Sequence, residues 1–128
     1  MTARAPVDRT RIDAVCRGDE SLAIELIGML VDEAAPIVAA LDVHVQSNDI
    51  TQVNELAHAL KGIAGNVGAF ELRDAATRLE AASAAGQTPA PHALAAEIPA
   101  LASALARVRI THRSWEARAA SNVGIFVS

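Results

Sequence analysis

The amino-acid sequence predicts an all-α protein, an antiparallel four-helix bundle with a short additional helix at its N-terminal end. Hydrophobic residues make up 52% of the 128 residues but aromatic residues only 2%, so alanine and leucine supply most of the apolar content. Both rank among the strongest helix formers. Apolar positions recur at helical spacing in several segments, and capping residues, glycines and prolines separate these segments by short links. The length fits one domain with a real hydrophobic core.

Two capping residues define the first two predicted helices. Asp8 is placed to cap a short helix over about residues 9–17, which ends at Gly18. Asp19 then caps a long helix that runs to about Val45. The inward positions expected on this long helix are Leu22, Leu26, Met29, Leu30, Ile37, Ala40, Leu41 and Val45.

Three further helices complete the predicted bundle. A third helix follows the turn at residues 47–49 and reaches about Asn66. A fourth spans about residues 69–85, and a last helix runs over about residues 92–117. Pro99 is expected to break the last helix within its first turns, because proline lacks a backbone N–H and clashes with the preceding turn.

The C-terminal end of the sequence breaks the helical pattern. We therefore assign residues 1–118 to one domain and residues 119–128 to a C-terminal tail, either disordered or docked on the bundle. Trp115 is the sole tryptophan and is expected to close the core, with a protein contact as the alternative.

Composition and charge exclude several classes of protein. The formal net charge of −4 leaves no basic footprint for nucleic acid. Cys16 is the only cysteine, which excludes an internal disulfide and a multi-cysteine zinc site and favours a small buried hydrophobe. No apolar run approaches the roughly 20 residues needed to span a bilayer, and the N-terminus lacks the apolar core of a signal peptide. We expect a cytoplasmic protein without a nucleic-acid or membrane partner.

His58 is the residue that most directly indicates a function. The apolar residues of its helix gather in one broad arc: Val53, Leu56, Ala57, Leu60, Ile63, Ala64 and Val67. His58 falls almost opposite the centre of this arc, so its imidazole is expected to face solvent in the middle of the helix. Lys61, one turn further on, is placed to lend positive charge to a phosphoryl group attached to the imidazole.

Gly62 and Gly65 lie on the same helix face as His58. Each interior helical glycine costs about 1 kcal/mol relative to alanine. Because the core arc lies on the other side, clearance for an incoming molecule explains these glycines better than helix packing does. The face therefore suits a phosphate-carrying histidine that a large partner must reach.

The segment from His58 to Ala69 resembles the signature of the histidine-containing phosphotransfer (Hpt) domain, His-x-Leu-Lys-Gly-x-Ala-x-x-Val-Gly-Ala. The resemblance extends over roughly residues 8–110. Further matching positions are Gly18-Asp19, Asn48-Asp49, Leu72 and Leu79-Glu80. Ile63 departs from the pattern, which commonly has a small residue there.

This resemblance implies a phosphorelay intermediate. His58 would accept a phosphoryl group from the phospho-aspartate of one receiver domain and donate it to the aspartate of another, in response regulators or hybrid histidine kinases. Lys61 would screen the phosphate, while Gly62 and Gly65 would admit loops of the receiver.

The chain would then be a phosphoryl carrier and not an enzyme, without a cofactor of its own. The sequence places no carboxylate cluster for magnesium near His58, so the receiver would bring the metal and most of the catalytic charge. A monomer is the simpler state for a carrier that docks two partners in turn.

Two other functions stay open. The domain is alternatively the substrate domain of a chemotaxis-type histidine kinase, which would phosphorylate the same His58 from an ATP site. It is otherwise a helical adaptor in which the histidine carries no phosphate.

The remaining histidines and two arginines receive simpler interpretations. No metal site is expected, because none of the other histidines has a partner at metal-ligand spacing: His44, His92 and His112. Arg73 and Arg78, on the helix after His58, are expected to be solvated, with a contribution to phosphate or partner binding as the alternative.

Overall fold

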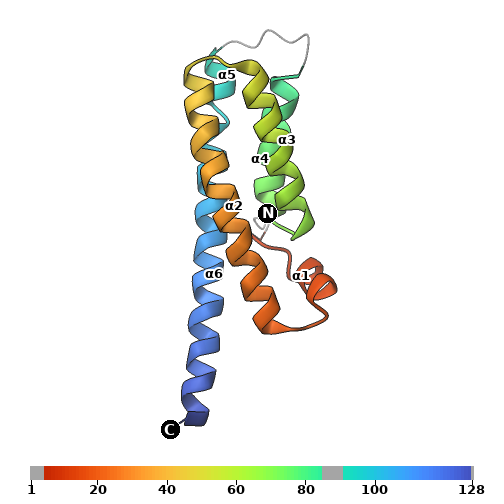
Figure 1. The fold of residues 1–128 in the computed structure, drawn as a ribbon, viewed down its shortest axis with the longest axis vertical. Helices are drawn as coiled ribbons and strands as arrows, with labels where there is room; N and C mark the ends of the chain where they lie inside the picture. The colour runs from red at the N-terminus through yellow and green to blue at the C-terminus, as the bar shows by residue number, and fades with distance from the viewer. Residues whose placement is uncertain (1–4, 85–90, 128) are drawn as a thin grey trace.

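The computed structural model describes residues 5–84 and 91–127, and these residues fold into helices without a strand (Figure 1). The described helices are α1 (Arg9–Cys16), α2 (Glu20–Gln46), α3 (Ile50–Asn66), α4 (Phe70–Ala82), α5 (Pro91–Ala95) and α6 (Ile98–Val127).

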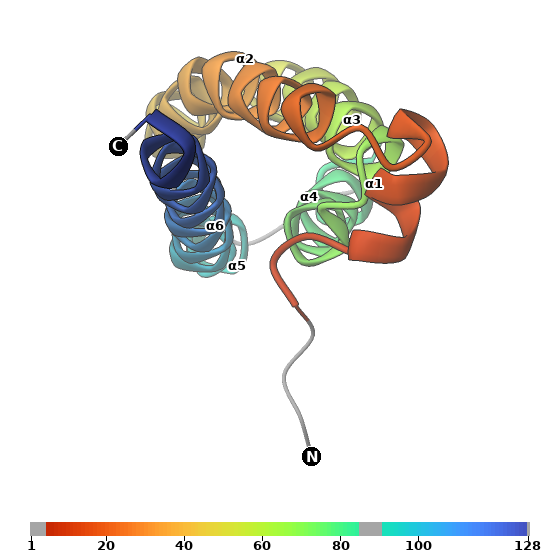
Figure 2. The same ribbon diagram turned by 90° about the horizontal axis from the view of Figure 1, so that it is seen from below.

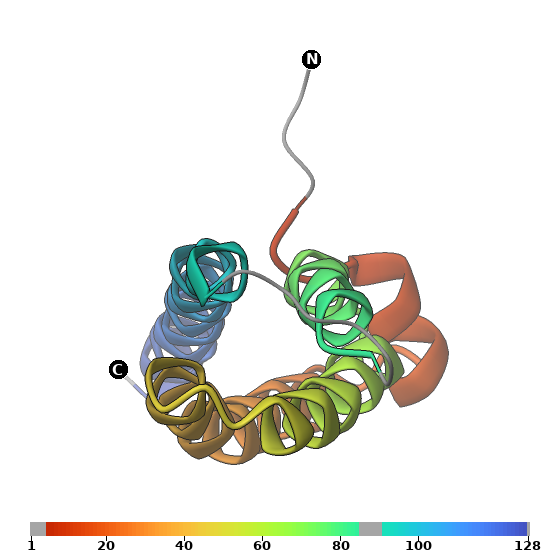
Figure 3. The same ribbon diagram turned by 90° about the horizontal axis from the view of Figure 1, so that it is seen from above.

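Four of these helices form an antiparallel bundle, which confirms the predicted fold class. Helices α2, α3, α4 and α6 run alternately in opposite directions along the long axis (Figure 1). Seen from either end they form a ring, in which α2 and α4 each contact both α3 and α6 (Figures 2 and 3). The short helix α1 lies beside the lower end of α3 and α4 (Figure 1).

The predicted capping residues begin their helices as expected. The carboxylates of Asp8, Asp19 and Asp49 each accept a hydrogen bond from the backbone N–H three residues on, at 3.0–3.2 Å. These bonds satisfy N–H groups that have no partner within the helix. The first three helices therefore start where local chemistry places them.

Gly68 fixes α1 against the end of α3. Its φ of +82° is a left-handed conformation that favours glycine, and a Cβ there would lie 2.9 Å from Cβ of Arg11. The backbone N–H of Asp8 donates to the Gly68 carbonyl at 2.8 Å, and Nε of Arg11 donates to the Asn66 carbonyl at 3.2 Å. The end of the His58 helix is thereby tied to the N-terminal segment.

The hydrophobic core runs along the inward faces of the bundle helices. On α3 the fully buried residues are Val53, Ala57, Leu60 and Ala64, the centre of the predicted arc. On α2 the buried residues are Ala23, Ile27, Leu30, Ala34, Val38, Leu41 and Val45. The inward assignment of Leu22 and Met29 was wrong, since these side chains are 38% and 49% exposed. The buried α2 face includes Ala23 and Ala34, small residues that a search for large apolar side chains overlooks.

The last predicted helix is interrupted early, as expected near Pro99. Helix α5 ends at Ala95 and α6 begins at Ile98, one residue before that proline. The predicted end of this helix near residue 117 was wrong, because α6 continues to Val127. No proline follows residue 117, and the next residues, Arg118, Ala119 and Ala120, are strong helix formers.

The described part of the chain contains no helix long and apolar enough to cross a membrane. Cys16 is buried, which confirms its expected place in the core. The division into a domain of residues 1–118 and a tail of residues 119–128 stays a prediction.

Candidate functional site

His58 projects from the middle of α3 into solvent. Its side chain is 69% exposed, while the neighbouring residues Ala57 and Leu60 are fully buried on the opposite side of the helix. In the structure the imidazole therefore faces solvent, as predicted. A solvent-facing ring at mid-helix is open to a partner protein.

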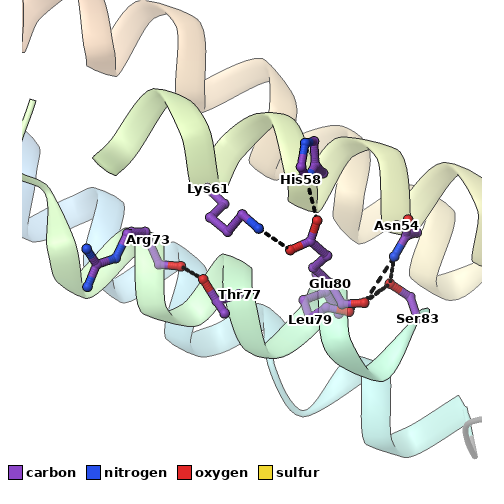
Figure 4. Close-up of polar contacts among 8 residues, drawn as sticks. All are labelled: Asn54, His58, Lys61, Arg73, Thr77, Leu79, Glu80 and Ser83. Atoms are coloured by element: carbon purple, nitrogen blue, oxygen red, sulfur yellow. Dashed lines mark hydrogen bonds and ion pairs between the residues drawn. The ribbon is translucent and has the colours of Figure 1, made fainter. Parts of the chain in front are cut away.

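A carboxylate from the next helix joins His58 to Lys61. Glu80 of α4 hydrogen-bonds through Oε2 to Nδ1 of His58, and its Oε1 accepts a hydrogen bond from Nζ of Lys61 at 2.6 Å (Figure 4). The Glu80 side chain is only 21% exposed and that of Lys61 is 34% exposed. Because both partners hold it in a partly desolvated position, the carboxylate has a defined orientation toward the imidazole.

Asn54 and Ser83 fix the backbone from which Glu80 projects. Nδ2 of Asn54 donates to the Glu80 carbonyl at 3.0 Å and to Oγ of Ser83 at 3.4 Å. The buried Ser83 hydroxyl in turn donates to the Leu79 carbonyl at 2.7 Å (Figure 4). These bonds satisfy carbonyl groups of the last turn of α4 and hold that turn on α3.

The electrostatics of the cluster keep Glu80 ionised. The hydrogen bond from the Lys61 ammonium is the main cause that lowers the pKa of Glu80, and the His58 ring acts in the same direction. Partial burial opposes the shift by disfavouring the charged form. Near neutral pH the carboxylate therefore accepts hydrogen bonds and donates none.

This state of Glu80 determines which nitrogen of His58 carries the proton. A neutral imidazole has one N–H and one lone pair, and the N–H must lie at the nitrogen that faces an ionised carboxylate. Nδ1 of His58 is that nitrogen. The lone pair then lies at Nε2, which has no hydrogen-bond partner among residues 5–84 and 91–127.

The two glycines of the His58 face differ in their surroundings. A Cβ at Gly62 would meet no heavy atom within 4 Å, so its lack of a side chain leaves open space. A Cβ at Gly65 would lie 3.3 Å from Cδ of Arg73, whose aliphatic stem covers that position. The inference that no side chain from another helix packs on this face therefore applies to Gly62 and fails at Gly65.

Neither of the two candidate arginines of α4 contacts His58. Arg73 pairs with Asp74 at 2.9 Å, and its guanidinium lies 4.4 Å from the ring centroid of Phe70. Figure 4 shows Arg73 extending away from His58. Nε of Arg78 donates to Glu97 at 3.0 Å, an ion pair between α4 and the link from α5 to α6. Neither arginine therefore lies beside the imidazole in this structure, and a contribution to partner binding stays a prediction.

The contact of Glu80 with His58 was not predicted from the sequence. Glu80 occupies a matching position of the Hpt pattern, but that position alone gives no contact partner. A signal was present, because Glu80 directly follows the buried Leu79 and so flanks the inward face of α4. Its pairing with His58 depends on the rotation of α4 against α3, which helical spacing alone does not give.

An apolar groove lies on the other side of α3, toward α2. It encloses about 160 Å³ and is lined mainly by Leu26, Met29, Ile63 and Val67. Met29 is 49% exposed at this groove. Lys61 and Glu80 thus lie beside His58 on the α4 side, whereas the groove lies further along α3 toward α2.

Within the described residues, no group of three or more histidine, cysteine, aspartate or glutamate side chains is placed to hold a metal ion. His44 lies 3.7 Å from Asp49 and His112 lies 3.5 Å from Glu116, in both cases between Nδ1 and a carboxylate oxygen.

Comparison with known proteins decides the family. The sequence model of the Hpt domain matches residues 25–109. The chain belongs to the Hpt domain family. Membership gives it a phosphotransfer role in a two-component phosphorelay. The range matched by the Hpt model contains His58, Lys61 and Glu80. The search of curated proteins found no match to the sequence.

A solved structure supports the Hpt fold over nearly the whole chain. The histidine-containing phosphotransfer protein B (HptB) of Pseudomonas aeruginosa PAO1 superposes with a TM-score of 0.75 at 20% sequence identity. The superposition covers 91% of this chain and 98% of HptB. At this identity the likeness establishes the fold.

Proposed function

We propose that His58 is the phosphoacceptor of this Hpt protein, and that it relays a phosphoryl group between two receiver domains. The observation that supports this proposal best is the exposed imidazole ring, whose Nδ1 faces the Glu80 carboxylate. This contact leaves Nε2 as the nucleophile. The donor is the phospho-aspartate of one receiver and the acceptor is the aspartate of another, in response regulators or hybrid histidine kinases.

The transfer step requires no proton to be added to His58 or removed from it. The Nε2 lone pair of His58 attacks the phosphorus, the bond from phosphorus to the aspartyl oxygen breaks, and the aspartate leaves as a carboxylate. The ring keeps its Nδ1 proton and becomes a phosphorylated imidazolium, whose positive charge faces Glu80. In the onward step a carboxylate oxygen of the acceptor aspartate bonds to the phosphorus, the bond from phosphorus to Nε2 breaks, and the neutral imidazole leaves.

Lys61 serves this reaction in two ways under the proposal. In the free protein its ammonium orients Glu80 at 2.6 Å. Once His58 is phosphorylated, the added charge of about −2 competes for the same ammonium, which lies one helical turn from the ring. The receiver supplies the metal and most of the catalytic charge, and the chain acts as a carrier without a cofactor.

The receiver docks over the α2–α3 side of His58 in this proposal. The open space at Gly62 admits its loops, and the groove at Met29 offers the apolar area that a specific contact requires. The proposal places the protein in the cytoplasm as a monomer, since one docking face serves both partners in turn.

The proposal is tested by phosphotransfer from purified, phosphorylated receiver domains of the source organism. We expect the wild-type protein to gain an acid-labile, base-stable phosphate and the His58→Gln variant to gain none. His92→Gln is the matched control, because His92 is exposed on α5 and outside the site. Equal labelling of wild type and His58→Gln would remove His58 as the acceptor.

The same residues also fit the substrate domain of a chemotaxis-type histidine kinase. Incubation with the catalytic domain of such a kinase and ATP separates the two functions. Labelling of His58 by the kinase, with none from any phosphorylated receiver, would replace the relay by the kinase-substrate function. A protein that no donor labels would be an adaptor.

A further inference from the structure

A second cavity lies at the end of the bundle away from α5. It encloses about 700 Å³ between the N-terminal segment, the first turn of α2 and the side of α6. Figure 2 shows this end, where the N-terminal segment passes between α6 and the pair formed by α1 and α4. The side chains that give the cavity its chemistry are Val7, Arg9, Glu20, Thr111, Trp115 and Arg118. None of them belongs to the His58 site.

The cavity exists because the helices of the bundle differ in length. Helix α4 has 13 residues and α6 has 30, so α6 continues past the end of α4 (Figure 1). The short segment at Val7 lies beside α6 at this end of the bundle, beyond the end of α4. Trp115 consequently packs on the core with part of its indole and lines the cavity with the rest.

Arg9 lines one side of the cavity. Its guanidinium is held by Glu20 and by Asp13, at 3.0 Å from the latter, and lies 4.5 Å from the centroid of the Trp115 ring. The two carboxylates raise the pKa of Arg9, so its charge persists and is already neutralised by its partners. A ligand in the cavity would meet Arg9 as a cation that is already paired with two carboxylates.

Two hydrogen-bond donors at the cavity have no partner. Within the described residues, Arg118 makes no hydrogen bond or ion pair, and neither does the indole N–H of Trp115. Both groups can only donate. The groups of the cavity that are available to a ligand are therefore the Arg118 cation and the indole N–H of Trp115. Beside them lie the indole ring and the apolar surface of Val7.

We propose that this cavity binds a small aromatic anion, whose ring packs beside the stacked Arg9 and Trp115 side chains and whose acidic group is held by Arg118. Its volume lies in the range of about 300–1,000 Å³ that is typical of small-molecule sites. Arginine and tryptophan donors match a carboxylate, sulfonate or phosphate, and the indole matches a planar ring. The site does not rest on the proposed function of His58.

The sole tryptophan makes the proposal directly testable. The chain has no tyrosine, so its fluorescence reports on Trp115 alone. We use 8-anilino-1-naphthalenesulfonate as the probe and measure energy transfer from Trp115 during a titration of the folded protein. The expected result is saturable binding of one molecule, with at least tenfold weaker binding of N-phenyl-1-naphthylamine, which has the same rings without the sulfonate.

A matched pair of arginine variants locates the anion. Arg118→Ala is expected to weaken binding of the sulfonate about tenfold, whereas Arg113→Ala is expected to leave it within twofold, because Arg113 is exposed on α6 and outside the cavity. Circular dichroism confirms that both variants are folded. Unsaturable binding, equal affinity for the uncharged probe or equal effects of the two variants would overturn the proposal.

Discussion

At the scale of single residues, the site depends on where one proton lies. Glu80 is ionised and faces Nδ1 of His58, so the structure selects the imidazole tautomer with its lone pair at the exposed Nε2. In an isolated histidine the two tautomers interconvert freely. Under the proposed function, the cluster thus prepares the nucleophile before a partner arrives, and Lys61 keeps the carboxylate in position.

Glu80→Gln should slow phosphotransfer to His58 about tenfold, because the amide retains the shape but cannot compensate the charge of the phosphorylated ring. The rate of phosphate uptake from a phosphorylated receiver measures this loss. The ¹⁵N chemical shifts of His58 supply a second readout and should change from one tautomer to a mixture. Glu55→Gln is the control, since Glu55 is exposed on the same helix and contacts none of these groups. Unchanged rates and shifts would show that Glu80 plays no positioning role.

Gly62→Ala should separate stability from docking. Alanine is favoured over glycine in a helix by about 1 kcal/mol, and the added Cβ meets no atom within 4 Å, so the free energy of unfolding should rise. Phosphotransfer should slow, because the methyl group enters the space left for the receiver. Urea unfolding and transfer rates measure the two effects. A stabilised variant that transfers at the wild-type rate would contradict the clearance argument.

At the scale of helices, the sequence predicted the elements better than their contacts. Helix α3 has a regular apolar period and an aspartate cap, so its limits and the direction of His58 follow from local rules. The pairing of His58 with Glu80 depends on how α4 is rotated and shifted against α3. That geometry follows from packing over the whole bundle, and no residue of α3 specifies it alone.

The contact of α2 with α6 could not be predicted for the same reason. Gly28 lies in the middle of α2, where helical periodicity gives no reason for a glycine. In the structure its missing side chain admits His112 of α6, whose Nε2 would lie 2.9 Å from a Cβ at that position. The glycine serves the approach of two helices far apart in the sequence.

This contact predicts an interaction between two substitutions. Gly28→Ala alone gains helix propensity but displaces the imidazole, whereas in a His112→Ala background only the gain of about 1 kcal/mol remains. The change in unfolding free energy caused by Gly28→Ala should therefore be more favourable in the His112→Ala background. Urea unfolding of the four proteins measures this difference. Additive effects would show that the two residues are not coupled.

At the scale of the whole molecule, surface ion pairs reinforce the contacts of α4 with α5 and α6. Arg107 of α6 pairs with Glu71 of α4 at 2.5 Å, and Arg78 of α4 pairs with Glu97 at 3.0 Å. Arg107 and Arg78 are about half exposed, so each pair contributes little to stability. The buried apolar faces supply most of the stability of the bundle, and Glu80 is a partly buried carboxylate whose pKa is lowered by its partners in the fold.

The pH dependence of global stability should reflect Glu80. Its pKa is lowered in the folded protein and takes its usual value of 4.5 in the unfolded chain, so the unfolded state binds the proton more tightly. The stabilisation is therefore present above pH 4.5 and is lost as the pH falls through the folded-state pKa. The Glu80→Gln variant lacks this titration. The gap in unfolding free energy between wild type and variant should be largest above pH 4.5 and should close in more acidic solution.

Urea unfolding at a series of pH values measures that gap. Glu55→Gln is the matched control, because it removes an exposed carboxylate of α3 and should leave a curve parallel to that of the wild type. A gap between wild type and Glu80→Gln that stays constant through this acidic range would show that Lys61 and His58 do not stabilise the Glu80 carboxylate in the folded protein. Closure of the gap for Glu80→Gln alone would assign the stabilisation to the cluster at His58, since both substitutions remove one negative charge but Glu80 is the one bonded to His58 and Lys61.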